Sequence, residues 1–179
     1  MADLVYYVAA SLDGFIAHPD GSFDGFEWDD EVVADFFAEL EGFGTVLMGR
    51  KTYDVGLAAG TTSPYPAMRQ VVFSRTMAAS PDDAVELARG DLAAFVRDLK
   101  AQADAPVWLC GGGDVAGTLA RAGLIDRLVV KLNPVVFGAG IPLVAPGAGL
   151  TSLTLTETQV YDCGIVVLRY EVGRPRKAT

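Results

Sequence analysis

Three short segments of the chain join an apolar run to residue types that bind phosphate. Residues 45–52 read TVLMGRKT, residues 71–75 read VVFSR, and residues 107–113 read VWLCGGG. An arginine offers a fork of N–H donors to an anionic oxygen, a lysine offers a point charge, and a hydroxyl offers one further donor. Consecutive glycines let a ligand approach the backbone, and a helix that follows them directs its first N–H groups toward that ligand. Each segment therefore suits the binding of a phosphate group.

Each of these segments also has a purely structural interpretation. Arg50 and Lys51 could form a solvated turn that balances an acidic chain, Arg75 could be an ordinary surface residue, and the triple glycine could be a tight turn without a ligand. The glycine spacing matches neither G-x-G-x-x-G nor G-x-x-x-x-G-K-[ST], which disfavours a Rossmann dinucleotide site and a P-loop. Asp114, directly after the glycines, would repel an anion.

The three segments carry more weight together, because each follows an apolar stretch that predicts a buried strand. In open α/β sheets, ligands bind outside the carboxyl ends of the strands. Three such ends with anion-binding groups predict one extended ligand with several phosphates. A dinucleotide with an extra phosphate fits that description.

The composition limits the classes of function. The chain has 179 residues, a formal net charge of −9 and 51% hydrophobic residues. We expect one domain over residues 1–173 and a frayed tail over 174–179. The acidity disfavours nonspecific binding of nucleic acid. No apolar run approaches the roughly 20 residues of a membrane helix, and the start lacks the basic region of a signal peptide. Two cysteines and a single histidine, His18, predict a cytoplasmic protein without a metal site.

Apolar periodicity predicts strands that alternate with helices. We expect strands at 4–10, 45–49, 69–74, 85–87, 107–110 and 126–136, and a final pair at 153–161 and 164–172 around a hairpin turn at 162–164. We expect helices at 31–41, from 50, after an N-cap at Asp91, and from the glycines to Arg121. The first of these helices should place five side chains inward, namely Val32, Val33, Phe36, Phe37 and Leu40. The alternation predicts an α/β fold of three layers, with a mixed, mostly parallel sheet and an antiparallel C-terminal hairpin at one edge.

Several longer segments resemble a known family. MGRKTY at 48–53, and VVFSRT at 71–76 followed later by the strand into Gly111–Gly113, resemble the signatures of dihydrofolate reductases. YVAASLDGFIA at 7–17, AGLIDRLVVKLNPVVFGAGIPL at 122–143 and YDCGIVVLRYEV at 161–172 resemble the branch that contains the C-terminal reductase domain of the riboflavin-pathway deaminase–reductase and stand-alone bacterial proteins. The resemblance covers nearly the whole chain. It implies a dihydrofolate-reductase-like fold and an NADPH-binding reductase.

The resemblance also implies roles for individual residues. Arg50, Lys51 and Thr52, after Gly49, would hold the adenosine-side phosphates. Ser74 and Arg75 would hold the 2′-phosphate that distinguishes NADPH from NADH. The pyrophosphate would be held by Gly111, Gly112 and Gly113 with the amide of Val115. Ala9 and Ile16 would line the nicotinamide, and core packing is the alternative role for these two residues.

The sequence departs from dihydrofolate reductases where the substrate would bind. Their first long helix carries an inward acid that binds the pterin, whereas the inward face expected here is apolar, so the sequence does not favour dihydrofolate as the substrate. Asp29 and Asp30 stand one turn earlier, where acids suit a helix start. No zinc-deaminase motif occurs. Lys131 and Arg127 are the basic candidates near the nicotinamide, on a strand that we expect to be partly buried.

Asp13, directly after the first strand, is the candidate catalytic residue. A reductase must deliver a proton to the reduced C=O or C=N bond, and Asp13 could supply that proton or orient a water or a substrate hydroxyl. An Asp-Gly turn is the structural alternative. We therefore expect an NADPH-dependent reductase of a small heterocyclic or carbonyl/imine substrate. A non-catalytic nucleotide-binding module on the same fold and a flavin protein are the alternatives.

A homodimer is expected for two reasons. The two final strands are long and apolar, with little charge to protect a sheet edge. Relatives in the branch that the chain resembles also tend to form homodimers.

Overall fold

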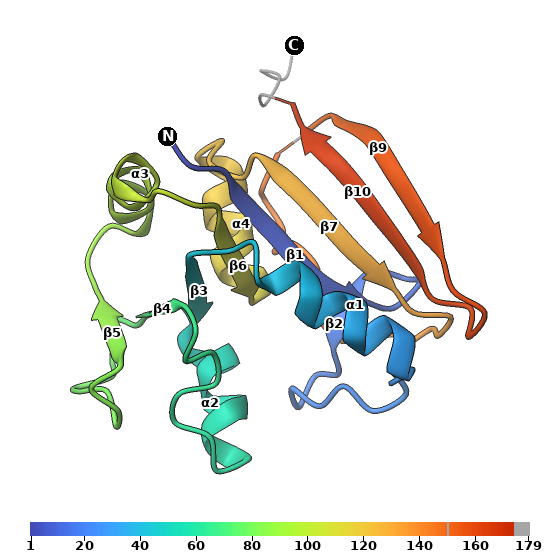
Figure 1. The fold of residues 1–179 in the computed structure, drawn as a ribbon, viewed down its shortest axis with the longest axis horizontal. Coiled ribbons are helices and arrows are strands. Elements are labelled where there is room, and N and C mark those ends of the chain that lie inside the picture. The colour runs from blue at the N-terminus through green and yellow to red at the C-terminus, as the bar shows by residue number, and fades with distance from the viewer. Residues whose placement is uncertain (150, 174–179) are drawn as a thin grey trace.

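The computed structural model describes residues 1–149 and 151–173, which form an eight-stranded sheet with helices on both faces (Figure 1). The order of the strands is β5-β4-β3-β6-β1-β7-β10-β9. The strands are β1 (Leu4–Ala10), β3 (Thr45–Gly49), β4 (Arg69–Phe73), β5 (Val85–Ala88), β6 (Val107–Gly111), β7 (Arg127–Leu132), β9 (Leu153–Val160) and β10 (Val166–Val172). The helices are α1 (Asp30–Leu40), α2 (Arg50–Ala58), α3 (Leu92–Gln102) and α4 (Gly113–Arg121).

The sheet is parallel from β5 to β7, and β10 and β9 add an antiparallel hairpin at one edge. The expected mixed, mostly parallel α/β sheet is therefore confirmed. Both faces of a parallel sheet are covered, which explains why its strands read as continuous apolar runs. Along β1, Leu4 and Tyr6 pack on the face covered by α3 and α4, whereas Val5 and Tyr7 pack on the face covered by α1 and α2. In Figure 1, α1 crosses in front of the sheet and α4 lies behind it.

Helix α1 begins where the sequence predicts it, but fewer of its apolar side chains are buried than expected. Asp29 is the N-cap, and its carboxylate accepts from the amides of Glu31 and Val32. Val32 and Leu40 are buried, while the Phe37 side chain is 58% exposed. The expectation of an inward Phe37 was wrong. At 3.6 residues per turn, Phe37 lies about 140° around the helix from Val32, outside the face that meets the sheet.

Strand β7 ends at Leu132, four residues before the expected end. Asn133 donates its amide N–H to Ala10 O as the last contact with β1. Pro134 follows and has no N–H with which to continue the ladder. The chain then enters the loop that leads to a second, two-stranded sheet.

That second sheet pairs β2 (Phe15–Ala17) with β8 (Ile141–Pro142) and was not anticipated. Segments of three and two residues are too short to show a period. The pairing brings the loop after β7 back to the end of β1.

Strand β9 lies at the sheet edge and is exposed along almost its whole length, whereas β10 buries Val167. The expected hairpin turn is confirmed, because Gly164 adopts φ +89° and donates its amide to Tyr161 O at 2.9 Å. The expected frayed tail at 174–179 lies outside the described residues.

Candidate active site

The three phosphate-binding segments of the sequence end at one edge of the sheet. Strands β4, β3 and β6 are neighbours and run parallel, with Gly49 paired with Phe73 and Met48 paired with Gly111. Ser74, Gly49 and Gly111 therefore follow or end three adjacent strands on the same side. This arrangement is the one expected for a ligand that contacts all three strand ends.

The helices that start at this edge have uncapped N-termini. Gly49 precedes α2 and Gly112 precedes α4, and neither has a side chain to cap the first amides. In α1 and α3, by contrast, Asp29 and Asp91 accept from these amides. Uncapped N–H groups and the positive end of the helix dipole favour an anion, so α2 and α4 together present two anion-binding ends.

The four glycines at this edge differ in what surrounds them. A Cβ at Gly113 would lie 2.3 Å from Pro142 O, and one at Gly49 would lie 2.9 Å from a methyl group of Val115, so packing of the protein itself excludes a side chain there. A Cβ at Gly112 would meet Thr52 Oγ1 at 3.5 Å and Ile16 Cδ1 at 3.8 Å, which are ordinary contacts.

Gly111 adopts φ +142°, which favours glycine, and the peptide bond between Gly111 and Gly112 is cis. A Cβ at Gly111 would lie 3.5 Å from Thr52 Oγ1, as at Gly112. Gly112 is therefore the partly exposed residue of the glycine turn, beside Thr52, whereas Gly111 is buried.

The basic side chains at this edge differ in whether they already form an ion pair within the protein. Arg50 Nε donates to Asp54 Oδ1 at 2.5 Å along α2, which turns part of the guanidinium toward its own helix. Lys51 and Arg75 are exposed, and neither forms an ion pair with the residues that the structure describes. Within the described residues, therefore, no carboxylate competes with a ligand for these two side chains.

Ser74 has a structural task in addition to any ligand contact. Its side chain is buried, and its Oγ accepts from the amides of Thr76 and Met77 at 3.3 and 2.9 Å. These bonds shape the turn that carries Arg75. The hydroxyl proton of Ser74 stays available for donation.

Asp13 ties two loops together. Its carboxylate accepts from Ser11 Oγ at 2.6 Å, from the amide of Phe137 at 3.1 Å and from that of Gly138 at 2.7 Å. The Ser11 hydroxyl bond, reinforced by these amides, holds the pKa of Asp13 below its ordinary value. The charged form is favoured, so the geometry suits an accepting and orienting role better than proton donation.

Farther along the same edge, β1 and β7 end beside the N-terminal part of α1. Ala9 and Lys131 are register partners in neighbouring strands. Lys131 Nζ lies 5.5 Å from the ring centre of Trp28 and 5.6 Å from that of Phe36. Arg127, the second basic candidate, lies at the opposite end of β7 and pairs with Asp3, so it does not reach this edge.

Asn133 is a positioning residue that the sequence analysis missed. It is buried, its Oδ1 accepts from the amide of Glu27 at 3.0 Å, and its Nδ2 donates to Lys131 O at 3.1 Å. It thus fixes the segment before α1 to the end of β7. The signal was available as a polar residue between an apolar strand and Pro134.

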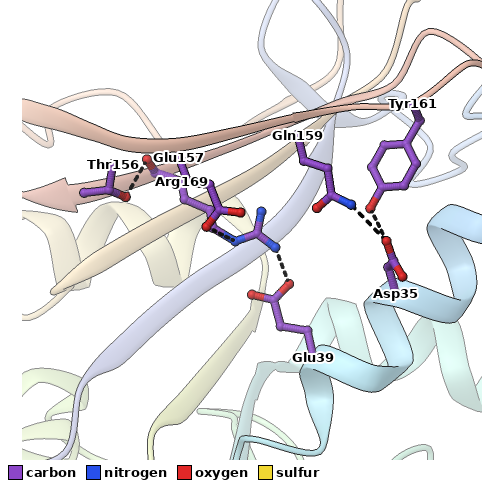
Figure 2. A network of polar contacts seen from close by, with 7 residues as sticks. All are labelled: Asp35, Glu39, Thr156, Glu157, Gln159, Tyr161 and Arg169. Carbon is purple, nitrogen blue, oxygen red and sulfur yellow. Dashed lines mark hydrogen bonds and ion pairs between the residues drawn. The ribbon is translucent and has the colours of Figure 1, made fainter.

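A polar network fixes α1 against the C-terminal hairpin (Figure 2). Asp35 accepts from Tyr161 Oη and from Gln159 Nε2, each at 2.9 Å. Arg169 donates to Glu39 at 2.8 Å, and Glu157 lies 3.8 Å from the same guanidinium. These contacts hold Phe36, on the same helix, over the sheet.

Other site types have no support in the part of the chain that the structure covers. Within residues 1–149 and 151–173, no group of three His, Cys, Asp or Glu side chains could hold a metal ion. None of the helices in those ranges has the length and hydropathy to cross a membrane. An apolar groove of about 420 Å³ lies beside α4, β7 and β10, but its lining carries no charged group, so we do not assign the chemistry to it.

Comparisons with known proteins bear on the family and the fold. A family model described as the RibD C-terminal domain matches residues 2–167. The uncharacterized protein YwjB of Bacillus subtilis (strain 168) is 32% identical over 164 residues, which cover 88% of this chain and 91% of YwjB.

Two solved structures extend the comparison. A putative riboflavin biosynthesis protein from Shewanella sp. PV-4 is similar with a TM-score of 0.83 and 28% identity, over 97% of this chain and 100% of that one. Dihydrofolate reductase from Enterococcus faecalis, complexed with NADP(H), has a TM-score of 0.68 and 16% identity over 98% and 97% of the two chains. The latter likeness confirms the dihydrofolate-reductase-like fold alone.

Proposed function

Because this chain belongs to the RibD C-terminal domain family, we propose that it is an NADPH-dependent reductase of a small heterocyclic or carbonyl/imine substrate. The observation that carries the proposal is the meeting of two uncapped helix N-termini at the glycine turn, where Gly112 is partly exposed beside Thr52. The bound NADP(H) of the similar dihydrofolate reductase supports the choice of cofactor.

The residues at the sheet edge suit the parts of NADPH. Gly111, Gly112 and the first amides of α4, Val115 among them, would hold the pyrophosphate. The first turn of α2, with Lys51 and Thr52, would hold the adenosine-side phosphate. Gly49 and Gly113 have a packing role. The absence of a side chain at Gly49 lets Val115 of α4 approach, and its absence at Gly113 lets Pro142 approach. The N-termini of α2 and α4 can therefore lie close together.

The turn after β4 suits the 2′-phosphate. Arg75 is exposed and unpaired within the described residues, and Ser74 retains a hydroxyl proton to donate. Arg50 contributes charge while it remains bonded to Asp54. A guanidinium binds a phosphate through two parallel N–H donors, which is the basis for preferring NADPH over NADH.

The reacting end lies farther along, at β1 and β7. The cofactor, when bound, supplies a hydride, and the protein must align the acceptor and exclude water. Ala9 and Ile16 would line the nicotinamide. Asp13, charged and bonded to the amides of Phe137 and Gly138, would orient a water or a substrate hydroxyl and fix the loop beside it.

Titration with NADPH and NADH tests this function. Wild-type protein should bind NADPH at least tenfold more tightly than NADH, and Arg75→Ala should remove most of this preference while NADH affinity changes little. Arg97→Ala, an exposed arginine on α3, is the matched control and should change neither affinity. Equal affinity of wild type for the two cofactors would contradict the assignment of Arg75.

A non-catalytic nucleotide-binding module is the second candidate. It is favoured by the apolar side chains Val32 and Phe36, which pack on the sheet. The acids of α1 that reach the sheet are already bonded within the protein, Asp35 to Tyr161 and Glu39 to Arg169. Under this alternative, NADPH binds but no carbonyl or imine compound is reduced. A panel that includes dihydrofolate and pterins separates the two functions.

We also propose that the protein is a cytoplasmic homodimer. The free thiols of Cys110 and Cys163 suit a reducing compartment. Leu153, Leu155 and Val160 expose apolar surface on the edge strand β9, where a second copy would be protective. Sedimentation analysis would give the mass of two chains, and a single-chain mass would contradict the proposal.

A further inference from the structure

Lys131 is a buried cation with no polar partner in the part of the chain that the structure covers. The residue is 9% exposed, and its Nζ approaches the rings of Trp28 and Phe36. Among residues 1–149 and 151–173, Nζ forms no hydrogen bond and no ion pair. Nζ keeps some contact with solvent, since within the described residues only Arg169 Nη1 is a buried side-chain atom without a partner, and two aromatic faces supply the rest of its surroundings.

The other buried lysine shows how this chain stabilises such a charge when the role is structural. Lys100 is 6% exposed, donates to Leu124 O at 2.9 Å, and forms an ion pair with Asp126. An ammonium that is partly withdrawn from water without such partners has lost part of its hydration and gained little from the protein in return. Lys131 therefore stabilises the fold less than Lys100, which points to a ligand as its partner.

The position of Lys131 places it at the end of the proposed site where the hydride acceptor would bind. It lies on β7 beside Ala9 and one residue before the strand end, on the face covered by α1. Asn133 bonds both Lys131 O and the amide of Glu27, and so fixes the segment that carries Trp28. Trp28 is 64% exposed, so the ammonium lies close to the surface rather than deep in the core.

We propose that Lys131 is the catalytic proton donor of the reaction, and that its ammonium meets the carbonyl oxygen or imine nitrogen of the acceptor. The proposal deepens the reductase function and rests on it. It assigns the acceptor to compounds with a polarised C=O or C=N bond that lies flat against Trp28 and Phe36, as a planar heterocycle would.

The step balances as follows. The acceptor carbon gains a hydride from the reduced nicotinamide, and the π electron pair of the C=O or C=N bond moves onto its oxygen or nitrogen. That atom takes a proton from Lys131 Nζ, which forms an O–H or N–H bond. The neutral amine of Lys131 then regains a proton from solvent. The bound cofactor would supply the two electrons, as hydride, and would be the group that is oxidised.

Burial lowers the pKa of Lys131, so its proton is easier to release than that of an exposed lysine. The nearby Cys163 side chain acts in the opposite direction on the pKa of Lys131. Arg169 is paired with Glu39, and Asp35 accepts from Tyr161 and Gln159. Further titratable groups on the neighbouring elements are Tyr7 on β1, Glu171 on β10, and Glu27, Asp29, Asp30 and Glu31 at the start of α1.

Two substitutions separate proton donation from simpler roles. Lys131→Met keeps the length of the side chain and suits the aromatic neighbours, so the fold should survive. Lys131→Arg keeps the positive charge but holds its proton too tightly to transfer it. A residue that only binds an anionic substrate would tolerate arginine, whereas a proton donor would not.

The test compares wild type, Lys131→Met and Lys131→Arg in NADPH binding, melting temperature and NADPH oxidation with a panel of carbonyl and cyclic imine compounds. We expect both variants to bind NADPH within twofold of wild type, and Lys131→Met to melt at the same temperature or higher. Both should lose at least 100-fold in kcat, within the range for removal of an acid catalyst. In wild type, kcat should fall above the pKa of Lys131, which ¹³C NMR of its ε-carbon measures independently of turnover.

Four results would overturn the proposal. Retention of kcat by Lys131→Met within threefold would remove the role, and recovery by Lys131→Arg with a change in KM alone would assign charge recognition instead. An NMR pKa at the ordinary value for lysine would contradict the environment on which the argument rests. Wild type that binds NADPH but reduces no compound would refute the reductase function itself, and the proposal with it.

Discussion

Alanine at Gly112 and at Gly113 should have opposite effects, although the two glycines are adjacent. Gly112 has φ −103° and ψ −168°, which other residues adopt, and an added Cβ would make only ordinary contacts with Thr52 and Ile16. Gly112→Ala should therefore fold, with a stability change within about 1 kcal/mol and a gain expected from the stiffer unfolded chain. The methyl group would lie against Thr52 and Ile16, at the place proposed for the pyrophosphate. NADPH affinity should fall at least tenfold, about 1.4 kcal/mol.

Gly113→Ala places its Cβ 2.3 Å from Pro142 O, so backbone must move. Overpacking of this kind costs about 1–3 kcal/mol. For a chain of this size, that corresponds to a melting temperature lower by roughly 2–12 °C. Calorimetry and NADPH titration of both variants give the comparison. If Gly112→Ala bound NADPH as tightly as wild type, Gly112 would not be at the cofactor site. If Gly113→Ala were as stable as wild type, the protein would not pack tightly against Gly113. Either result would refute the different roles given to the two glycines.

Two further predictions concern stability. Burial and the hydrogen bond to Asp35 raise the pKa of Tyr161 to about 12. The folded state therefore holds the phenol proton more tightly than the unfolded state, and this stabilisation is complete below pH 10 and is lost as the pH rises through about 12. Tyr161→Phe should flatten the alkaline fall in urea-unfolding stability, and an unchanged slope would contradict the shift. Asp29→Ala should lower the free energy of unfolding by about 1 kcal/mol, because the N-cap of α1 is lost. Asp30→Ala, the control in the first turn, should change the free energy of unfolding by less than about 0.5 kcal/mol. Equal effects of the two substitutions would contradict the assignment of Asp29 as the cap.

The strands of the sheet, and the candidate phosphate-binding residues at their carboxyl ends, could be predicted because short local sequence patterns mark both. Continuous apolar runs such as residues 45–49 mark strands that are buried on both faces, and a change to glycine, arginine or a hydroxyl marks the carboxyl end. The order β4-β3-β6 places these ends next to one another. Pattern alone identified the ends, and the parallel topology brought them together.

The other parts of the site depend on contacts that no local pattern encodes. The partners of Asp13 are backbone amides at Phe137 and Gly138, more than 120 residues away along the chain. The β2–β8 pairing and the Asn133 contact with Glu27 likewise join distant segments. Phe37 is the converse case, because the sequence pattern predicted burial that the structure does not have. An apolar residue that neighbours the buried face of a helix can itself be exposed.

A crystal structure with NADPH bound tests the central claim most directly. The account predicts the pyrophosphate between Gly112 and the first turn of α2, with the 2′-phosphate at Arg75. NADPH bound in the apolar groove beside α4, or with its phosphates away from both helix N-termini, would contradict it.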